Sequence, residues 1–168
     1  IREFFSPGEL ALIYLNFPTP FPRKRDAHLR MASMERLMDF RDVLVTGGEV
    51  SFKTDSQPLF DFMLTQVPLA GYRIVRESRD ARADFPDEPA SEYEERLSAQ
   101  GAKVLSLAVV PGPAPEHAEQ TAELSLAAYL PQDLASLEEI SYAPHGMQAT
   151  VANLRNRAER LSSRSAGR

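Results

Sequence analysis

The sequence contains no cysteine and no tryptophan, and only three of its 168 residues are histidine. Without cysteine the chain can form neither a disulfide nor a thiolate metal site. The three histidines, His28, His117 and His145, are far apart in the sequence, so a structural zinc site is not expected. No apolar run approaches the roughly 20 residues that a membrane-spanning helix needs, so no membrane partner is expected.

Acidic residues outnumber basic ones, which gives a net charge of −5. This balance argues against non-specific nucleic-acid binding by the whole surface, but it allows a local basic patch. One basic cluster consists of Arg23, Lys24, Arg25 and Arg30, and the stretch 77–95 is predominantly acidic. A second basic segment follows residue 150 and contains Arg155, Arg157, Arg160, Arg164 and Arg168.

A composition of 43% hydrophobic and 26% charged residues is sufficient for one core, so the chain fits one domain or a domain with a short appendage. The first residue is isoleucine rather than methionine, and the sequence itself contains no signal or transit peptide. The prediction is therefore a fragment of a longer, cytoplasmic protein.

The most informative segment is the proline-rich loop, residues 16–25, which follows the apolar run Leu10–Phe17. The run predicts a strand buried on both faces, as in a parallel sheet. The prolines at 18, 20 and 22 fix the backbone, so ordering the loop costs little entropy. The carboxyl end of such a strand is the usual ligand crevice of an α/β protein. The loop is therefore a candidate ligand site, although prolines could simply stiffen a crossover beside a solvated basic face.

The remaining pattern alternates strands and helices and predicts a doubly wound α/β sheet. The expected elements are a helix capped by Asp26 and running to about residue 44 before Gly47 and Gly48, a strand over 49–53, a helix from 54–56 to Gly71, a strand over 72–76, a loop over 80–89, a helix over 91–100 and a strand over 104–110.

Three regions follow from this pattern: a sheet domain over residues 1–110, a linker over 111–118 rich in proline and glycine, and a helical C-terminal extension over 119–168. Within the extension, helical patterns cover residues 119–130, 132–140 and 149–161. The arginine-rich end of the last pattern could dock RNA or another partner, and we retain such a tail-mediated binding protein as one alternative.

Two short motifs have both a structural and a functional interpretation. Asp55 follows the predicted strand over 49–53, where it could cap the next helix or contribute a carboxylate to a site. Ser91 and Glu94 match a capping box, in which the glutamate satisfies backbone N–H groups. Taken alone, each motif favours the structural interpretation.

Taken together, the motifs resemble one family. The ordered blocks are FFSPGEL (4–10), IYLNFP (13–18), PRKR (22–25), GGEVSFKTD (47–55), LFDF (59–62) and SEYEERLSAQG (91–101). In this order and spacing they resemble the bacterial tRNA (guanine-N7-)-methyltransferases, over about residues 4–110. The resemblance implies a class I, S-adenosylmethionine-dependent methyltransferase with a Rossmann-like sheet.

Within that fold, the resemblance implies that the chain supplies the C-terminal half, the fourth to seventh strands. The glycine-rich cofactor loop belongs to the other half, and no G-x-G-x-x-G pattern occurs here. Asn16 and Phe17 are then expected at the edge of the S-adenosylmethionine site. The first strand should have an unpaired edge, which favours a homodimer or pairing with a missing N-terminal half.

The resemblance also assigns roles in binding tRNA. Asp55 and Thr19, which replaces the family's aspartate, would be catalytic. Asp55 and Glu94 would accept hydrogen bonds from the guanine, and Ser91 would also bind the substrate. Arg23, Lys24, Arg25 and Arg30 would contact phosphates. Five positions depart from the family pattern: Thr19 replaces an aspartate, Phe21 a tryptophan, Asp26 a histidine, His28 a lysine and Leu29 an arginine. The loss of the loop acid keeps a second alternative open, a non-catalytic RNA-binding or interaction module on the same fold.

Overall fold

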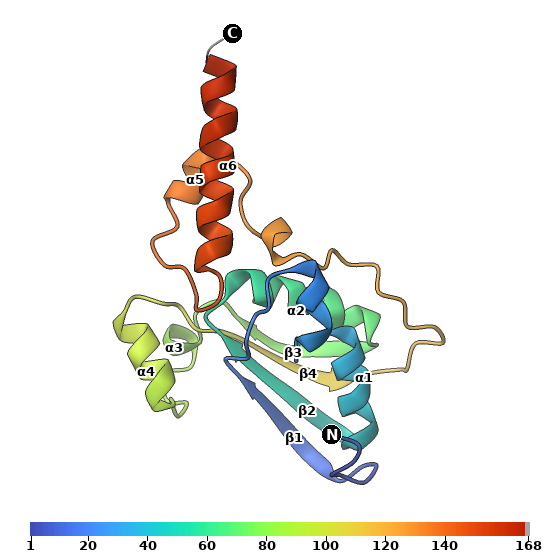
Figure 1. Ribbon diagram of the computed structural model, residues 1–168. Helices are drawn as coiled ribbons and strands as arrows, with labels where there is room; N and C mark the ends of the chain where they lie inside the picture. The colour runs from blue at the N-terminus through green and yellow to red at the C-terminus, as the bar shows by residue number, and fades with distance from the viewer. Residues whose placement is uncertain (167–168) are drawn as a thin grey trace.

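The computed structural model describes the backbone of residues 1–166 and the side chains of residues 1–163. Its centre is a four-stranded sheet in the order β1-β2-β4-β3 (Figure 1). The strands are β1 (Leu10–Asn16), β2 (Leu44–Thr54), β3 (Tyr72–Ser78) and β4 (Leu105–Pro111). β1 and β2 are parallel, whereas β4 is antiparallel to both of its neighbours, β2 and β3. The predicted Rossmann-like α/β class is confirmed, with a mixed sheet.

Helices α1 (Met34–Val43) and α2 (Gln57–Leu69) form the core with the sheet. In β2, Val50 and Phe52 are fully buried, while Lys53 between Phe52 and Thr54 is only partly buried, as the period of a strand requires. Phe60 and Phe62 of α2 are also fully buried, and the Phe60 ring stacks on Phe52. Each such aromatic contributes roughly 1.5–3 kcal/mol through burial alone.

The expectation that the first strand is buried on both faces is wrong. β1 pairs only with β2 among the described strands, so it forms an edge of the sheet. Leu15 is its one buried residue, whereas the Tyr14 side chain is 65% exposed. The unpaired edge itself was predicted, and the described part of the chain has it.

The helix after the proline-rich loop begins later than predicted. Asp26 lies inside a short 3₁₀ helix, η1 (Lys24–Leu29), and α1 is capped instead by Ser33, whose hydroxyl accepts from the Arg36 N–H. Gly47 and Gly48 do not end this helix, because α1 ends at Val43 and β2 begins at the next residue. The glycines lie where the pairing register between β1 and β2 shifts, a place where their small size allows an irregular strand.

The acidic stretch 80–89, predicted as a loop, contains the short helix α3 (Ala81–Asp84). Helix α4 (Glu92–Ala99) follows close to its predicted position, with Ser91 as its N-cap. Among residues 1–166, no helix is long and apolar enough to cross a membrane. The described residues also contain no group of acidic or histidine side chains that could hold a metal ion.

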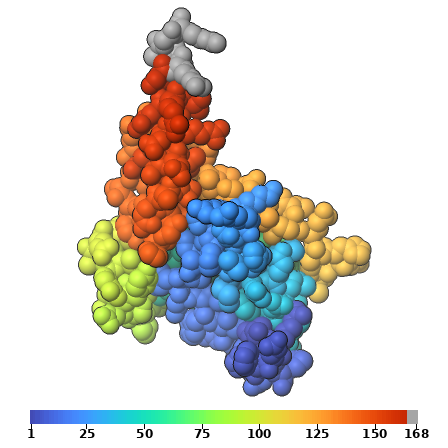
Figure 2. Space-filling model, viewed as in Figure 1, coloured from blue at the N-terminus to red at the C-terminus, as the bar shows by residue number. Residues whose placement is uncertain are grey.

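The C-terminal extension contains η2 (Leu126–Tyr129), α5 (Leu134–Glu138) and α6 (Gln148–Ala166). The predicted helix over 119–130 is thus reduced to one 3₁₀ turn. Leu126 and Met147 are fully buried and belong to the main core, so the extension packs onto the sheet domain both at η2 and just before α6. The rest of α6 rises away from the sheet (Figures 1 and 2). The Arg164 side chain and Arg168 lie outside the described residues.

Candidate functional site at the carboxyl end of β1 and β2

The proline-rich loop and the end of β2 lie side by side, because Asn16 pairs in register with Lys53. The backbone N–H of Phe17 continues this pairing and donates to the Lys53 carbonyl at 2.7 Å. Phe17 and Phe21 both adopt positive φ, 50° and 45°, which side chains other than glycine rarely do. Surrounding contacts must therefore hold the loop in this shape.

Arg30 provides that support from beneath the loop. Its Nε and Nη2 donate to the carbonyl oxygens of Pro20 and Phe21, with Nη2 at 2.7 Å from the Phe21 oxygen. The guanidinium also lies 4.6 Å from the centre of the Phe62 ring. Burial lowers the pKa of Arg30 to about 10. Arg30 is fully buried, so the expectation that it contacts phosphate is wrong, and its role is to position the loop.

The other three cations of the cluster remain accessible. Arg23, Lys24 and Arg25 are exposed at the start of η1, immediately after the last proline of the loop. Within the described residues, Arg25 has one ion pair, with Asp26 at 3.7 Å, and no ion pair holds Arg23 or Lys24. These three side chains can therefore reach an anionic ligand.

Lys53 of β2 and Glu94 of α4 form an ion pair away from the core that β2 shares with α1 and α2. Lys53 Nζ lies 3.3 Å from Glu94 Oε2, and the Glu94 side chain is only 3% exposed. Glu88 lies 3.6 Å from Lys53 and also pairs with Arg76, and Arg82 lies 3.8 Å from Glu94. Half of the predicted capping box is present, since Ser91 Oγ accepts from the Glu94 N–H. The Glu94 carboxylate, however, turns to Lys53.

A polar groove of about 390 Å³ lies above this network and is lined by Asn16, Lys53, Ser91 and Glu94, among others. Ser91 is exposed at its rim, whereas Glu94 reaches it from a buried position. Glu94 can therefore accept a hydrogen bond from a ligand only in competition with the Lys53 ammonium.

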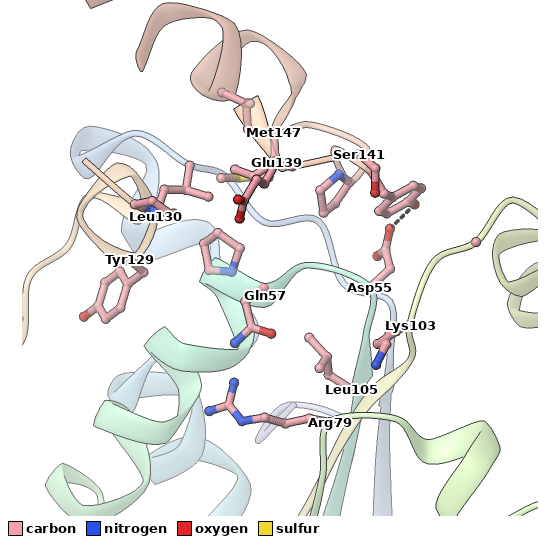
Figure 3. Close-up of a pocket in the computed structure, with 17 residues that line it drawn as sticks. Asp55, Gln57, Arg79, Lys103, Leu105, Tyr129, Leu130, Glu139, Ser141 and Met147 are labelled. Carbon is pink, nitrogen blue, oxygen red and sulfur yellow. Dashed lines mark hydrogen bonds between the residues drawn. The ribbon is translucent and has the colours of Figure 1, made fainter. Parts of the chain in front are cut away.

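Asp55 lines a different cavity, of about 640 Å³, between the start of α2 and the extension (Figure 3). The Tyr142 hydroxyl donates to Asp55 Oδ2 at 2.6 Å. Burial, and secondly the Asp55 carboxylate, raise the pKa of Tyr142 above its ordinary value. The cavity walls are mainly apolar, with Leu105 and Met147 on opposite sides. Asp55 and Glu94 thus line separate cavities. A single guanine bound in one cavity can contact only one of the two carboxylates.

Thr19 is exposed at the tip of the proline-rich loop, with no hydrogen bond to another described residue. Asn16 is also exposed, and its carboxamide is free to bond a polar ligand. The Phe17 ring packs edge-on against the Tyr93 ring, with 5.2 Å between the ring centroids. Asn16 and Phe17 can therefore contribute to a ligand site at this end of the sheet.

The contact of Asp55 with Tyr142 was not predicted from the sequence. The two residues are 87 positions apart, and no local motif marks Tyr142 as a partner. Lys53, by contrast, stands in the GGEVSFKTD block and in the predicted strand over 49–53.

One comparison bears on this arrangement. The family model Methyltransf_4, described as "Putative methyltransferase", matches residues 1–107. The match covers the sheet, the proline-rich loop, Asp55 and Glu94, and it ends inside β4. Because it spans more than half of the chain, this protein belongs to the Methyltransf_4 family of methyltransferases.

Proposed function

We propose that the protein is the C-terminal half of an S-adenosylmethionine-dependent tRNA (guanine-N7-)-methyltransferase. The observation that carries the proposal is the position of Asp55 at the carboxyl end of β2, next to a proline-rich loop that ends in three exposed cations. The family match supports methyl transfer. The choice of guanine N7 and tRNA rests on the ordered sequence blocks and on the chemistry of these residues.

Methylation at N7 needs no base to remove a proton, because this nitrogen already carries a free lone pair. A bond from N7 to the methyl carbon forms while the carbon–sulfur bond breaks, and the purine gains positive charge. A carboxylate near the ring stabilises that charge as it develops. Asp55 is suited to this role, and it can also accept from the N1–H and amino group of guanine, which fixes the orientation of the base.

Binding of the RNA backbone falls to Arg23, Lys24 and Arg25. Their guanidinium and ammonium groups are free to contact phosphates, which fix register rather than sequence. A target base inside folded RNA must leave its stack to reach the Asp55 cavity, as is usual for enzymes that modify bases. The net charge of −5 disfavours RNA binding by the surface as a whole, so a local basic patch such as this one would have to supply it.

S-adenosylmethionine would supply the electrophilic methyl group when it is bound. Asn16, at the carboxyl end of β1, would hydrogen-bond to it, and Phe17 would flank it. The residues described here form one side of such a site, so the other side would come from an N-terminal half or from a second copy of the chain.

The second candidate function is a non-catalytic RNA-binding module. Thr19 favours it, because a hydroxyl replaces the acid expected at the tip of the loop. The Asp55 carboxylate favours it as well, since it already accepts a hydrogen bond from the Tyr142 hydroxyl. Both candidates predict tRNA binding, and only the first predicts methyl transfer.

The deciding experiment incubates the full-length protein with S-adenosylmethionine and an unmodified tRNA transcript. Nuclease digestion and mass spectrometry then measure N7-methylguanosine. We expect product above background, and we expect Asp55→Ala to abolish it without abolishing tRNA binding. If tRNA binds but no N7-methylguanosine forms, the enzymatic proposal is wrong and the RNA-binding module remains.

A further inference from the structure

The C-terminal extension packs against the proline-rich loop and is hydrogen-bonded to it. The N–H of Leu126 donates to the Pro22 carbonyl at 3.0 Å, and Leu126 itself is fully buried. The turn before α6 packs on the same loop, where a Cβ added at Gly146 would lie 3.2 Å from Pro20 Cγ. Met147, next in the chain, is buried in the core. Residues 141–147 therefore occupy a defined place at the mouth of the Asp55 cavity.

Tyr142 makes the one side-chain hydrogen bond that Asp55 receives from the described residues. The oxygen–oxygen distance of 2.6 Å is short, as expected when a hydroxyl donates to a carboxylate. Figure 3 shows the Asp55 side chain pointing toward the extension, where a dashed line marks the hydrogen bond that it accepts. Neither residue is fully buried, so the bond can break without uncovering the core.

We infer that Tyr142 is an internal competitor for Asp55, and that a guanine binds this carboxylate only after the Tyr142 hydroxyl has left it. The inference rests on the proposed function, which assigns Asp55 to the guanine. Guanine offers two adjacent donors, N1–H and the amino group, which together pair with both oxygens of one carboxylate; an oxygen that already accepts a short hydrogen bond from a phenol is a weaker acceptor for a second donor. The phenol hydroxyl is a donor of the same kind and holds one of those oxygens.

The cavity is suited to a purine nucleotide once the hydroxyl has moved. Its volume of about 640 Å³ lies within the range of small-molecule sites, and Leu105 and Met147 offer apolar surfaces for a flat ring. Arg79 and Lys103 lie at its edge, where they could meet a phosphate. Arg79 now pairs with Asp61 and Glu77, and Lys103 pairs with Asp80; these pairs are at least partly exposed and cost little to exchange.

The experiment compares nucleotide binding by the full chain and its Tyr142→Phe variant, using isothermal titration calorimetry. Guanosine 5′-monophosphate and inosine 5′-monophosphate carry the N1–H donor, whereas adenosine 5′-monophosphate carries an acceptor at that position. We expect Tyr142→Phe to lower the Kd of the guanosine nucleotide by roughly tenfold, the value of one hydrogen bond to a charged acceptor, and to lower that of the inosine nucleotide, which lacks the amino group, by less. Binding of the adenosine nucleotide should not change.

Tyr129→Phe is the matched control. It removes a hydroxyl from the same extension, but that hydroxyl donates to the Glu123 carbonyl and not to Asp55. We expect its affinities to equal those of the wild type. In an Asp55→Ala background, Tyr142→Phe should not change the Kd of any nucleotide, because the carboxylate for which the hydroxyl and the base compete is absent.

Hydrogen exchange of the wild type provides a readout that needs no variant. Guanosine 5′-monophosphate should raise exchange in residues 141–147, whereas the adenosine nucleotide should not. Equal Kd values for the guanosine nucleotide in the wild type and Tyr142→Phe, or unchanged exchange in this segment, overturn the inference. These outcomes are independent of the methylation assay: competition can be present in a protein that transfers no methyl group, and methyl transfer can occur without it.

Discussion

The Arg30 guanidinium and the Phe21 carbonyl oxygen lie 2.7 Å apart, nine residues from one another in the sequence. Arg30 is fully buried, and Phe21 has a positive φ of 45°. The guanidinium therefore holds a strained peptide in the shape that presents the tip of the proline-rich loop. An arginine that the sequence placed among phosphate ligands instead determines the geometry of the site.

Replacing Arg30 with methionine should destabilise the fold by about 2–3 kcal/mol, because two backbone carbonyls lose charged donors in a buried environment. Urea unfolding followed by circular dichroism measures this change. Arg23→Met is the control, since Arg23 is exposed and its loss should change stability by no more than about 0.5 kcal/mol. Equal stability of the two variants would show that Arg30 does not hold the loop.

Removing Lys53 should be more damaging than removing the whole ion pair. In Lys53→Met the Glu94 carboxylate, only 3% exposed, loses its nearest cation, and we expect a loss of about 3 kcal/mol. The double variant Lys53→Met, Glu94→Gln should recover most of this loss, because no unpaired charge stays buried. Chemical denaturation of the two variants tests this, and a double variant less stable than Lys53→Met contradicts it.

The pH dependence of stability follows from two tyrosines. Burial raises the pKa of both Tyr72 and Tyr142 above the ordinary value, so ionisation occurs first in the unfolded chain. Their contribution to stability is complete below about pH 10 and is lost as the pH rises toward the folded-state values. Thermal unfolding between pH 8 and pH 11 should show Tm falling above pH 10. Tyr72→Phe should reduce that fall, and an unchanged slope would contradict this account.

The sequence predicted the α/β class because its signals are local. Val50 and Phe52 alternate with polar residues, and Gly71 marks the end of α2, so each element could be recognised within a few residues. The edge position of β1 was also foreseen from the resemblance. Boundaries failed where the turn depended on tertiary contacts: Asp26 seemed a suitable cap, but the chain first forms η1, and Ser33 caps α1 instead.

The sequence predicted where the segments of the candidate site lie, but not which side-chain contacts they make. The blocks around the proline-rich loop and Lys53–Asp55 placed the residues at one sheet edge. Three facts required the folded chain: the burial of Arg30, the engagement of Glu94 with Lys53, and the contact of Tyr142 with Asp55. Each depends on how segments distant in sequence pack together, and neither periodicity nor motif spacing carries that information.

Binding of tRNA should depend on the three cations that the structure leaves exposed. Changing Arg23, Lys24 and Arg25 together to glutamine removes up to three phosphate contacts, so affinity should fall and the slope of log K against log salt should flatten by about 2–3. Filter binding from 50 to 300 mM salt measures both quantities. The change leaves the loop intact, because Arg30 still holds it.

The matched variant changes Arg157 and Arg160 of α6 to glutamine, and it tests the alternative of a tail that binds RNA. Arg155 is unsuitable for this purpose, because its guanidinium donates to the Leu137 and Ile140 carbonyls and fastens α6 to α5. We expect the α6 variant to bind tRNA nearly as the wild type does. A larger loss from the α6 variant than from the loop variant would transfer the RNA-binding surface from the proline-rich loop to the C-terminal helix.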